Sequence, residues 1–286
     1  MSLVLLTPAS WFGWVGMLVS MLVLSGCVSQ GGVSSRAFGG TGGAGGSTAG
    51  NGADIVTASD EPALRKRARL RMELAIGYFE AGQPEVALDE VKQSLVIDPG
   101  YADAYNLRGL IYMRLDDAGL AEDSFRRAIA INPREPNTLH NYGWLLCQQN
   151  RFGDASQQFN LALAVPGYAD RPKTLMTQGL CQLRAGNRVE AERLLMQAYE
   201  LDAGNPVVGF NLAQLMVQRN EWSRAQFYAR RVNNSPSANA ETLWLGVRIE
   251  RRLNNREAMT QLAGQLQRRF PQSREALAYE RGNFDD

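Results

Sequence analysis

The sequence predicts an all-α protein, built as a superhelical array of about six helix–turn–helix repeats. The main observation is a pair of small residues, always twelve positions apart, that recurs along the chain. The pairs are Ala75/Ala87, Gly109/Ala121, Gly143/Ala155, Gly179/Ala191, Ala213/Ala225 and Gly246/Ala258. Successive pairs are separated by 34, 34, 36, 34 and 33 residues. A period near 34 with small residues in register is typical of paired helices that stack into an array.

The second repeat shows the pattern most fully. Gly109 and Tyr112 mark its first helix, Ala121 and Phe125 mark its second, and Pro133 ends it because proline cannot continue a helix. These residues match the tetratricopeptide pattern, which places small residues where two helices cross closely. We expect the crossing to lie between Gly109 and Ala121, where a larger side chain would push the helices apart.

The repeats define the expected domain boundaries. A repeat domain is predicted over residues 61–272, followed by a C-terminal cap and tail over 273–286, in which a short capping helix is expected from Ser273 to Tyr279. The match to the pattern is best in the first four repeats and weakens afterwards, as is common where an array must be capped. The six repeats are expected near 68–101, 102–135, 136–169, 172–205, 206–238 and 239–272.

The N-terminal segment is predicted to be a targeting signal and not part of the fold. Residues 1–26 contain no Lys, Arg, Asp or Glu, and the run from Trp11 to Leu24 is almost wholly apolar. Such a segment is either a secretory signal or a membrane span. Its end, L-S-G-C at 24–27, resembles the bacterial lipobox, which implies that Cys27 receives an acyl lipid and becomes the first residue of the mature chain. The alternative is an uncleaved membrane anchor.

Residues 27–60 are predicted to be a flexible tether. Ten glycines lie between positions 31 and 52, and such a segment cannot bury enough surface to offset its ordering entropy. A Gly-rich chain of this length reaches about 30 Å. Val28 directly after the cysteine resembles lipoproteins sent to the outer membrane, so we expect a lipid-anchored domain that faces the periplasm.

Composition and charge favour a protein-binding function over catalysis. The net charge of +1 argues against nucleic acid or an anionic membrane as the main partner, and we interpret the basic run at 65–71 as a solvated helix face. His140 is the only histidine, so the chain can assemble neither a metal cluster nor a Ser-His-Asp relay. We expect His140 to be a groove or packing residue. No enzyme activity, small-molecule substrate or cofactor other than the acyl lipid is predicted.

A partner-binding groove is predicted along the first helices, which line the concave wall of such arrays. Positions three before, one after and four after the small residue share one helical stripe. We call the set from the first three repeats the groove residues: Met72, Ile76, Phe79, Asn106, Leu110, Met113 and Trp144. The stripe also includes His140 and Cys147 in the third repeat, and it continues with Met176, Leu180, Leu183, Phe210, Gln214 and Val217.

The composition of this stripe predicts an apolar partner segment, either an amphipathic helix or an extended peptide. A groove for acidic tails would need Lys and Asn at these positions, and only Asn106 complies. The alternative is that about half of these side chains are ordinary packing between helices, which stacked repeats always need.

Two of the three cysteines are predicted to pair. If Cys27 is acylated, Cys147 and Cys181 remain, and in a secreted protein they can oxidise. They lie four and two residues after their small residues, and this offset, about 200° around a helix, can turn neighbouring helices face to face. We expect a disulfide between the third and fourth repeats; the alternative is two buried free thiols.

Three short motifs make the chain similar to a known family. They are N-Y-G-W-L-L-C at 141–147, P-G-Y at 166–168 and Q-G-L-C at 178–181. Together with the lipobox and six repeats, they resemble the type IV pilus pilotin lipoproteins of the PilF/PilW family, over about residues 65–270. The resemblance implies an outer-membrane lipoprotein that binds the pilus secretin through repeats one and two and promotes its localisation and multimerisation. The alternative is a lipid-anchored periplasmic scaffold for cell-wall enzymes or β-barrel assembly.

Overall fold

The computed structural model describes residues 61–284. The predicted signal segment, the lipid attachment at Cys27 and the tether lie outside the described residues, as do Asp285 and Asp286. Within 61–284, none of the helices is both long enough and apolar enough to cross a membrane.

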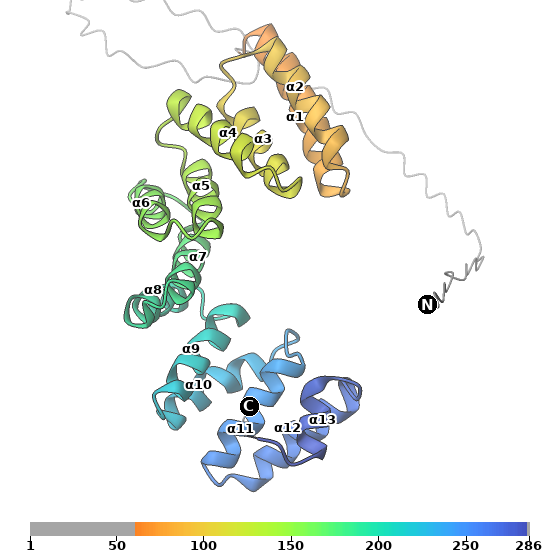
Figure 1. Cartoon of the computed structure of the whole chain (residues 1–286), viewed down its shortest axis with the longest axis vertical. Coiled ribbons are helices and arrows are strands. Elements are labelled where there is room, and N and C mark those ends of the chain that lie inside the picture. Colours follow the sequence, from red (N-terminus) through yellow and green to blue (C-terminus); the bar gives the residue numbers. More distant parts are fainter. Residues whose placement is uncertain (1–60, 285–286) are drawn as a thin grey trace, which may run out of the picture. The chain divides into compact units, whose positions relative to one another are not determined.

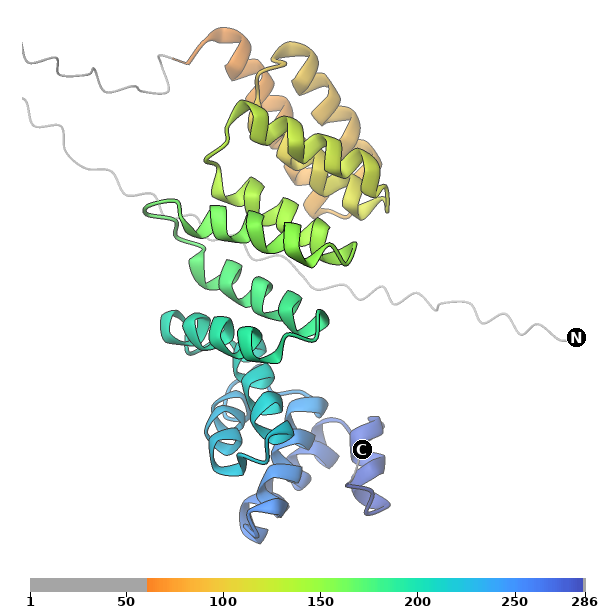
Figure 2. The ribbon, with the colours of Figure 1, turned by 60° about the vertical axis from the view of Figure 1, so that its left-hand side comes forward.

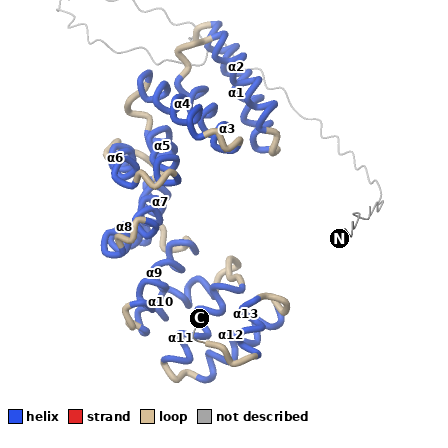
Figure 3. The backbone as a smooth tube through the Cα atoms, in the orientation of Figure 1, coloured by secondary structure: helices blue, strands red, loops and turns tan. Residues whose placement is uncertain are grey.

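Residues 61–284 form thirteen α-helices and no strands (Figures 1 and 3). Twelve of the helices form six consecutive pairs, and the two helices of each pair pack along one another. This confirms the predicted all-α array. The helices are α1 (Ala63–Glu80), α2 (Pro84–Ile97), α3 (Ala102–Arg114), α4 (Ala118–Ile131), α5 (Pro136–Gln148), α6 (Phe152–Leu163), α7 (Arg171–Arg184), α8 (Arg188–Leu201), α9 (Pro206–Gln218), α10 (Trp222–Asn233), α11 (Ala240–Arg252), α12 (Arg256–Arg269) and α13 (Arg274–Glu280).

The first helices of the pairs lie on one side of the array. Helix α3 contacts α1 and α5, α5 contacts α7, and α9 contacts α11, whereas no second helix within 61–284 packs comparably on the next second helix. Figure 2 shows the pairs following one another in sequence order, from orange at the N-terminal end to blue at the C-terminal end. Each of the first five second helices instead contacts the first helix of the following pair, and α12 contacts α13. The first helices of the six pairs, α1, α3, α5, α7, α9 and α11, therefore form the inner wall that the repeat pattern predicts.

Each turn within a pair contains one residue in the left-handed conformation. Asparagine and aspartate tolerate this conformation better than most residues with a Cβ, and glycine adopts it freely. These residues are Gly82, Asp116, Asn150, Gly186, Asn220 and Asn254. Their spacing is 34, 34, 36, 34 and 34 residues. The last step is one residue longer than the spacing of the small pairs, so the sixth repeat has a different register from the predicted one.

The predicted pair Gly246/Ala258 is therefore wrong by one position. The residue seven before the left-handed turn is Val247, which is fully buried, whereas Ala258 is only half-buried. Asn239 caps α11 and exchanges hydrogen bonds with Thr242, which sets the start of this helix. In the sixth repeat a valine thus takes the place of the usual glycine or alanine.

A second substitution compensates for this valine. Phe125 of α4 and Ala263 of α12 occupy equivalent positions, because each lies nine residues after the left-handed residue of its turn. Both side chains are buried. Gly109 opposite Phe125 becomes Val247 opposite Ala263, so the large and the small residue have exchanged places. Such an exchange keeps the volume between the helices nearly constant, which packed interiors tolerate.

Helix α1 begins at Ala63, five residues before the first repeat, which is expected near residue 68. Glu61 accepts a hydrogen bond from Arg69 at 3.2 Å, Arg65 pairs with Asp98 beyond the end of α2, and the α1–α2 interface has a further ion pair. These contacts tie the first turns of α1 to their surroundings. The basic run is solvated as expected, but it is also paired. Lys66 and Arg67 are exposed, and the side chains of Arg65 and Arg69 form ion pairs while remaining 35% and 38% exposed.

The last helix, α13, closes the C-terminal end of the array. It packs against both α11 and α12, and it buries Ala276 completely. Ser273 accepts a hydrogen bond from the backbone N–H of Ala276 and so caps the helix. Helix α13 therefore covers the apolar surface that a further repeat would otherwise cover.

Candidate functional site

In repeats two and three, the small residue of the first helix is needed because of an aromatic ring on the second helix. A Cβ on Gly109 would lie 2.6 Å from the Phe125 ring, and one on Gly143 would lie 2.8 Å from the Phe159 ring. The sequence pattern predicts a tight contact between Gly109 and Ala121. The structure instead places the tight contact between the glycine and the aromatic ring. These contacts hold one face of each first helix against its partner and leave another face for the inner wall.

The groove residues lie on three consecutive first helices, α1, α3 and α5. None is fully buried: Ile76 is 37% exposed and the other six are half-buried. Met72 and Phe79 pack partly against the core of the first two repeats, and Leu110, Met113 and Trp144 pack partly against the core of the second and third. Each of these five side chains therefore packs on the core with one side and remains accessible to a partner on another. A residue can thus belong to both the groove and the core.

One polar groove residue is already engaged. The side-chain oxygen of Asn106 accepts a hydrogen bond of 3.1 Å from the amide of Asn141, which joins α3 to α5. This bond occupies one lone pair of that oxygen. Since the other six groove residues are apolar, the groove at repeats one to three presents mainly apolar surface.

The third repeat differs from the expected stripe, since His140 and Cys147 are buried and do not reach the wall. Nδ1 of His140 lies 2.8 Å from Oγ1 of Thr174 on α7, and its ring meets Phe159 edge to face. The longer connection before α7 places Tyr168 against the same threonine at 2.8 Å. Burial lowers the pKa of His140 to about 4, with a further lowering by the charge of nearby Lys173.

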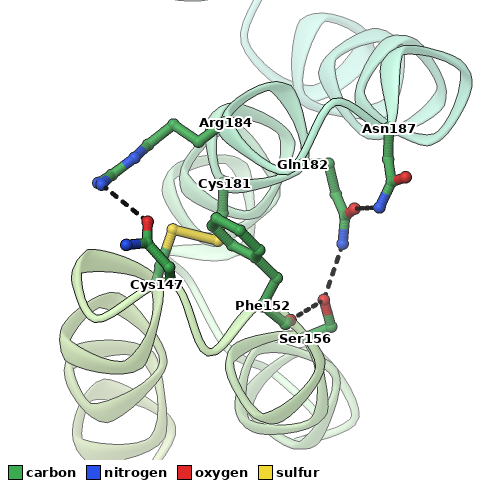
Figure 4. Close-up of a disulfide and its surroundings, with 8 residues drawn as sticks. Cys147, Phe152, Ser156, Cys181, Gln182, Arg184 and Asn187 are labelled. Atoms are coloured by element: carbon green, nitrogen blue, oxygen red, sulfur yellow. Dashed lines mark hydrogen bonds between the residues drawn. A yellow bond between two sulfur atoms is a disulfide. The ribbon is translucent and has the colours of Figure 1, made fainter.

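Cys147 and Cys181 form a disulfide between α5 and α7, the pairing that the sequence predicts (Figure 4). Their Cα atoms are 5.9 Å apart and both residues are buried. Around the bond, Gln182 donates a hydrogen bond of 2.8 Å to Ser156 and accepts one of 2.7 Å from Asn187. The third and fourth repeats are thus joined covalently and by a polar chain beside the bridge.

The inner wall changes character at its C-terminal end. The stripe residues of repeats four and five are half-buried and, except for Gln214, apolar. With the corrected register, repeat six contributes Trp244, Arg248 and Arg251 to the same stripe. The small-residue pattern missed these residues because it placed the small position of the repeat at Gly246 and not at Val247. The helix cap formed by Asn239 and Thr242 is the sequence signal that could have corrected this register.

Comparison with known proteins defines the class of this chain. The tetratricopeptide repeat family matches residues 72–136 and again 182–236. The six helix pairs, the period and these matches show that the chain is a tetratricopeptide repeat protein. The solved structure of YrrB, a tetratricopeptide repeat protein with an unusual peptide-binding site, shares this fold alone, at 13% identity and a TM-score of 0.53 over 67% of this chain and 97% of YrrB.

Within this class, the chain is similar to two type IV pilus proteins. It is 28% identical to the type IV pilus assembly protein PilF of Pseudomonas aeruginosa over 204 residues, which cover 71% of this chain and 81% of PilF. The solved structure of P. aeruginosa PilF matches with a TM-score of 0.69 and 27% identity, over 76% of this chain and 99% of that one. The structure of PilW, a widely conserved type IV pilus biogenesis factor, matches with a TM-score of 0.66 and 27% identity, over 75% and 99%. The resemblance to the PilF/PilW family is thereby confirmed.

Proposed function

We propose that this protein is an outer-membrane lipoprotein pilotin, which binds the secretin of a type IV pilus system and promotes its localisation and multimerisation. The observation that carries the proposal is the similarity to PilF and PilW over about three quarters of the chain, which supports a role in type IV pilus biogenesis. The lipobox-like end of the N-terminal segment supports attachment through Cys27, with the array facing the periplasm.

The binding surface in this proposal is the part of the inner wall formed by α1 and α3. Met72, Ile76, Phe79, Leu110 and Met113 present apolar surface there, and methionine side chains adapt their shape to a partner. An apolar segment of the secretin would remove this surface from water, which is the main favourable term in such association.

The proposed mechanism is tethering without catalysis. A binder that is anchored in the outer membrane holds secretin subunits close to that membrane, so their local concentration rises and assembly is favoured by mass action. No group on the protein has to react. The lipid anchor and the groove are both required, since either one alone would not bring subunits to the membrane.

The experiment that tests this function follows heat-resistant secretin multimers in membrane fractions. We expect deletion of the gene to abolish the multimers and the wild-type gene to restore them. Phe79→Glu should fail to restore them, because a charge in the groove opposes an apolar partner, and Cys27→Ala should fail because the protein is no longer anchored. Val189→Glu is the matched control, since Val189 lies on α8 outside the inner wall and is 84% exposed.

The outcomes separate the role from the site. Multimers that persist after deletion contradict the pilotin role and favour a scaffold for other envelope proteins. Full restoration by Phe79→Glu would keep the role but place the binding surface elsewhere. The thermal midpoint of Phe79→Glu should be measured alongside, because Phe79 also packs partly on the core.

A further inference from the structure

Three arginines at the C-terminal end of α11 form a cluster on and beside the inner wall of repeat six. We call Arg248, Arg251 and Arg252 the arginine cluster. Together with Trp222 and Phe284 they line a small cavity of about 80 Å³. Because the three residues are spaced three and four positions apart, they share one face of the helix.

The cluster has no ion-pair partner within residues 61–284. Two arginines that lie between helices elsewhere in the array are neutralised: Arg151 pairs with Glu122 at 2.9 Å, and Arg230 pairs with Glu250 at 2.9 Å. The latter pair uses the only carboxylate in the last turns of α11, and Glu250 is 2% exposed. Three positive charges are therefore concentrated at one place without compensation from the described residues.

Aromatic rings hold two of these arginines in place. The guanidinium carbon of Arg251 lies 3.9 Å from the centre of the Phe284 ring, and that of Arg252 lies 5.5 Å from the Trp222 ring. Phe284 in turn stacks on Trp244, with ring centres 5.4 Å apart. A guanidinium that stacks through its face keeps the N–H groups on its edge available, and these groups match the geometry of a carboxylate.

Arg248 also lines a second, larger cavity. It has a volume of about 370 Å³ and is lined by residues of α9, α11 and α13. Phe210 and Trp244 give it aromatic surface, and Gln214 lies beside them. Its rim carries both signs of charge, since Glu241 and the paired residues Arg274 and Glu275 also line it. A ligand with negative charge would therefore be attracted by the arginine cluster and not by the larger cavity. The larger cavity suits an apolar or aromatic side chain.

We propose that this end of the inner wall, at repeats five and six, binds an acidic peptide segment of a partner protein. Its carboxylates would pair with the arginine cluster, and a neighbouring aromatic side chain would enter the larger cavity. Clusters of arginine are a recurrent means of recognising acidic motifs, and tryptophan and arginine dominate the energetics of many interfaces. This site is separate from the apolar groove at repeats one and two, so it does not depend on the function proposed above.

The test is a binding measurement with a defined probe. A fluorescein-labelled heptapeptide, with one tryptophan flanked on each side by an aspartate and a glutamate and with glycine at both ends, is titrated with the full chain in a non-ionic detergent. Fluorescence anisotropy reports the affinity. We expect Arg248→Gln/Arg251→Gln to weaken binding roughly tenfold or more, since two charge-assisted hydrogen-bonding partners are lost.

The matched control has the same change in net charge. Arg256→Gln/Arg281→Gln removes two exposed arginines from the same end of the array, and both lie outside the two cavities. This variant should bind like the wild type. A second probe, with asparagine and glutamine in place of the acidic residues, should bind at least tenfold more weakly to the wild type.

Three outcomes would overturn the proposal. Equal weakening in both double variants would show general attraction by net charge. Equal binding of the neutral probe would show that carboxylates are not recognised. If the peptide bound only to the variant Asp285→Asn/Asp286→Asn, the ligand of the arginine cluster would be the two acidic residues that directly follow Phe284 in this chain. The cluster would then not bind a partner protein.

Discussion

Gly109 illustrates how a single residue sets the distance between two helices. A Cβ at this position would meet the Phe125 ring at 2.6 Å, so Gly109→Ala forces the ring or the helix to move. We expect the free energy of unfolding to fall by about 1–3 kcal/mol. Gly77 is the control: it lies inside α1 with no atom within 4 Å of an added Cβ. Gly77→Ala should raise stability by about 0.5–1 kcal/mol in the same denaturant titration, because alanine favours helix.

His140 predicts how stability depends on pH between 6.5 and 4. Its pKa in the folded protein is about 4, below the ordinary value of 6.5, so folding favours the neutral ring. The stabilisation is therefore complete above pH 6.5 and is lost as the pH falls towards 4. At pH 5.5 the loss should be on the order of 1 kcal/mol.

The measurement is the thermal midpoint at pH 7.5 and pH 5.5. Because His140 is the only histidine, His140→Gln should remove most of the difference between the two midpoints, whatever its effect on absolute stability. A variant that keeps the wild-type difference would show that another group titrates in this range.

At the level of elements, the disulfide is the strongest single link between repeats. It joins residues 34 positions apart, and a loop of this length corresponds to about 3–4 kcal/mol in the chain-entropy estimate. We expect Cys147→Ala/Cys181→Ala to lower the thermal midpoint. Hydrogen exchange should accelerate most in α5 and α7 and least in α1 and α2, since repeats interact mainly with their neighbours. Uniform acceleration along the chain would contradict this local effect.

The sequence predicts the order of the elements well, for a physical reason. Small residues must recur wherever two helices cross closely, so the period is visible in the chain itself. The register of the sixth repeat could not be read this way. Val247 occupies the position of the usual glycine or alanine, and the smaller Ala263 lies opposite it. Gly246 beside it imitates the usual pattern, and only the cap at Asn239 and the left-handed Asn254 mark the true position.

The candidate groove was predicted only in part. One helical stripe suffices to place Leu110 and Met113 on the inner wall, because both follow from the position of Gly109. It does not suffice for His140, whose burial depends on Thr174 of the next repeat, 34 residues away. The ion pair between Arg65 and Asp98 likewise joins residues that no local pattern connects.

For the whole molecule, the two ends of the inner wall differ in chemistry. The groove residues of repeats one to three are mainly apolar, whereas repeat six adds the arginine cluster. A stacked array allows such a difference, since each repeat contacts only its neighbours and can change its surface without altering distant packing. The two proposed sites, one for an apolar segment and one for an acidic segment, can therefore coexist in one array.

The disulfide also has a mechanical consequence. In the proposed role the protein is anchored at one end and attached to a pilus assembly at the other. A pulling force on that assembly would extend the array as its helices unravel. The 34-residue span between the bridged cysteines cannot contribute to that extension while the bond is intact. Pulling the oxidised protein from both termini should give a final contour length roughly 110–120 Å shorter than pulling the reduced one. The bridge thus sets an upper limit on how far the array can stretch.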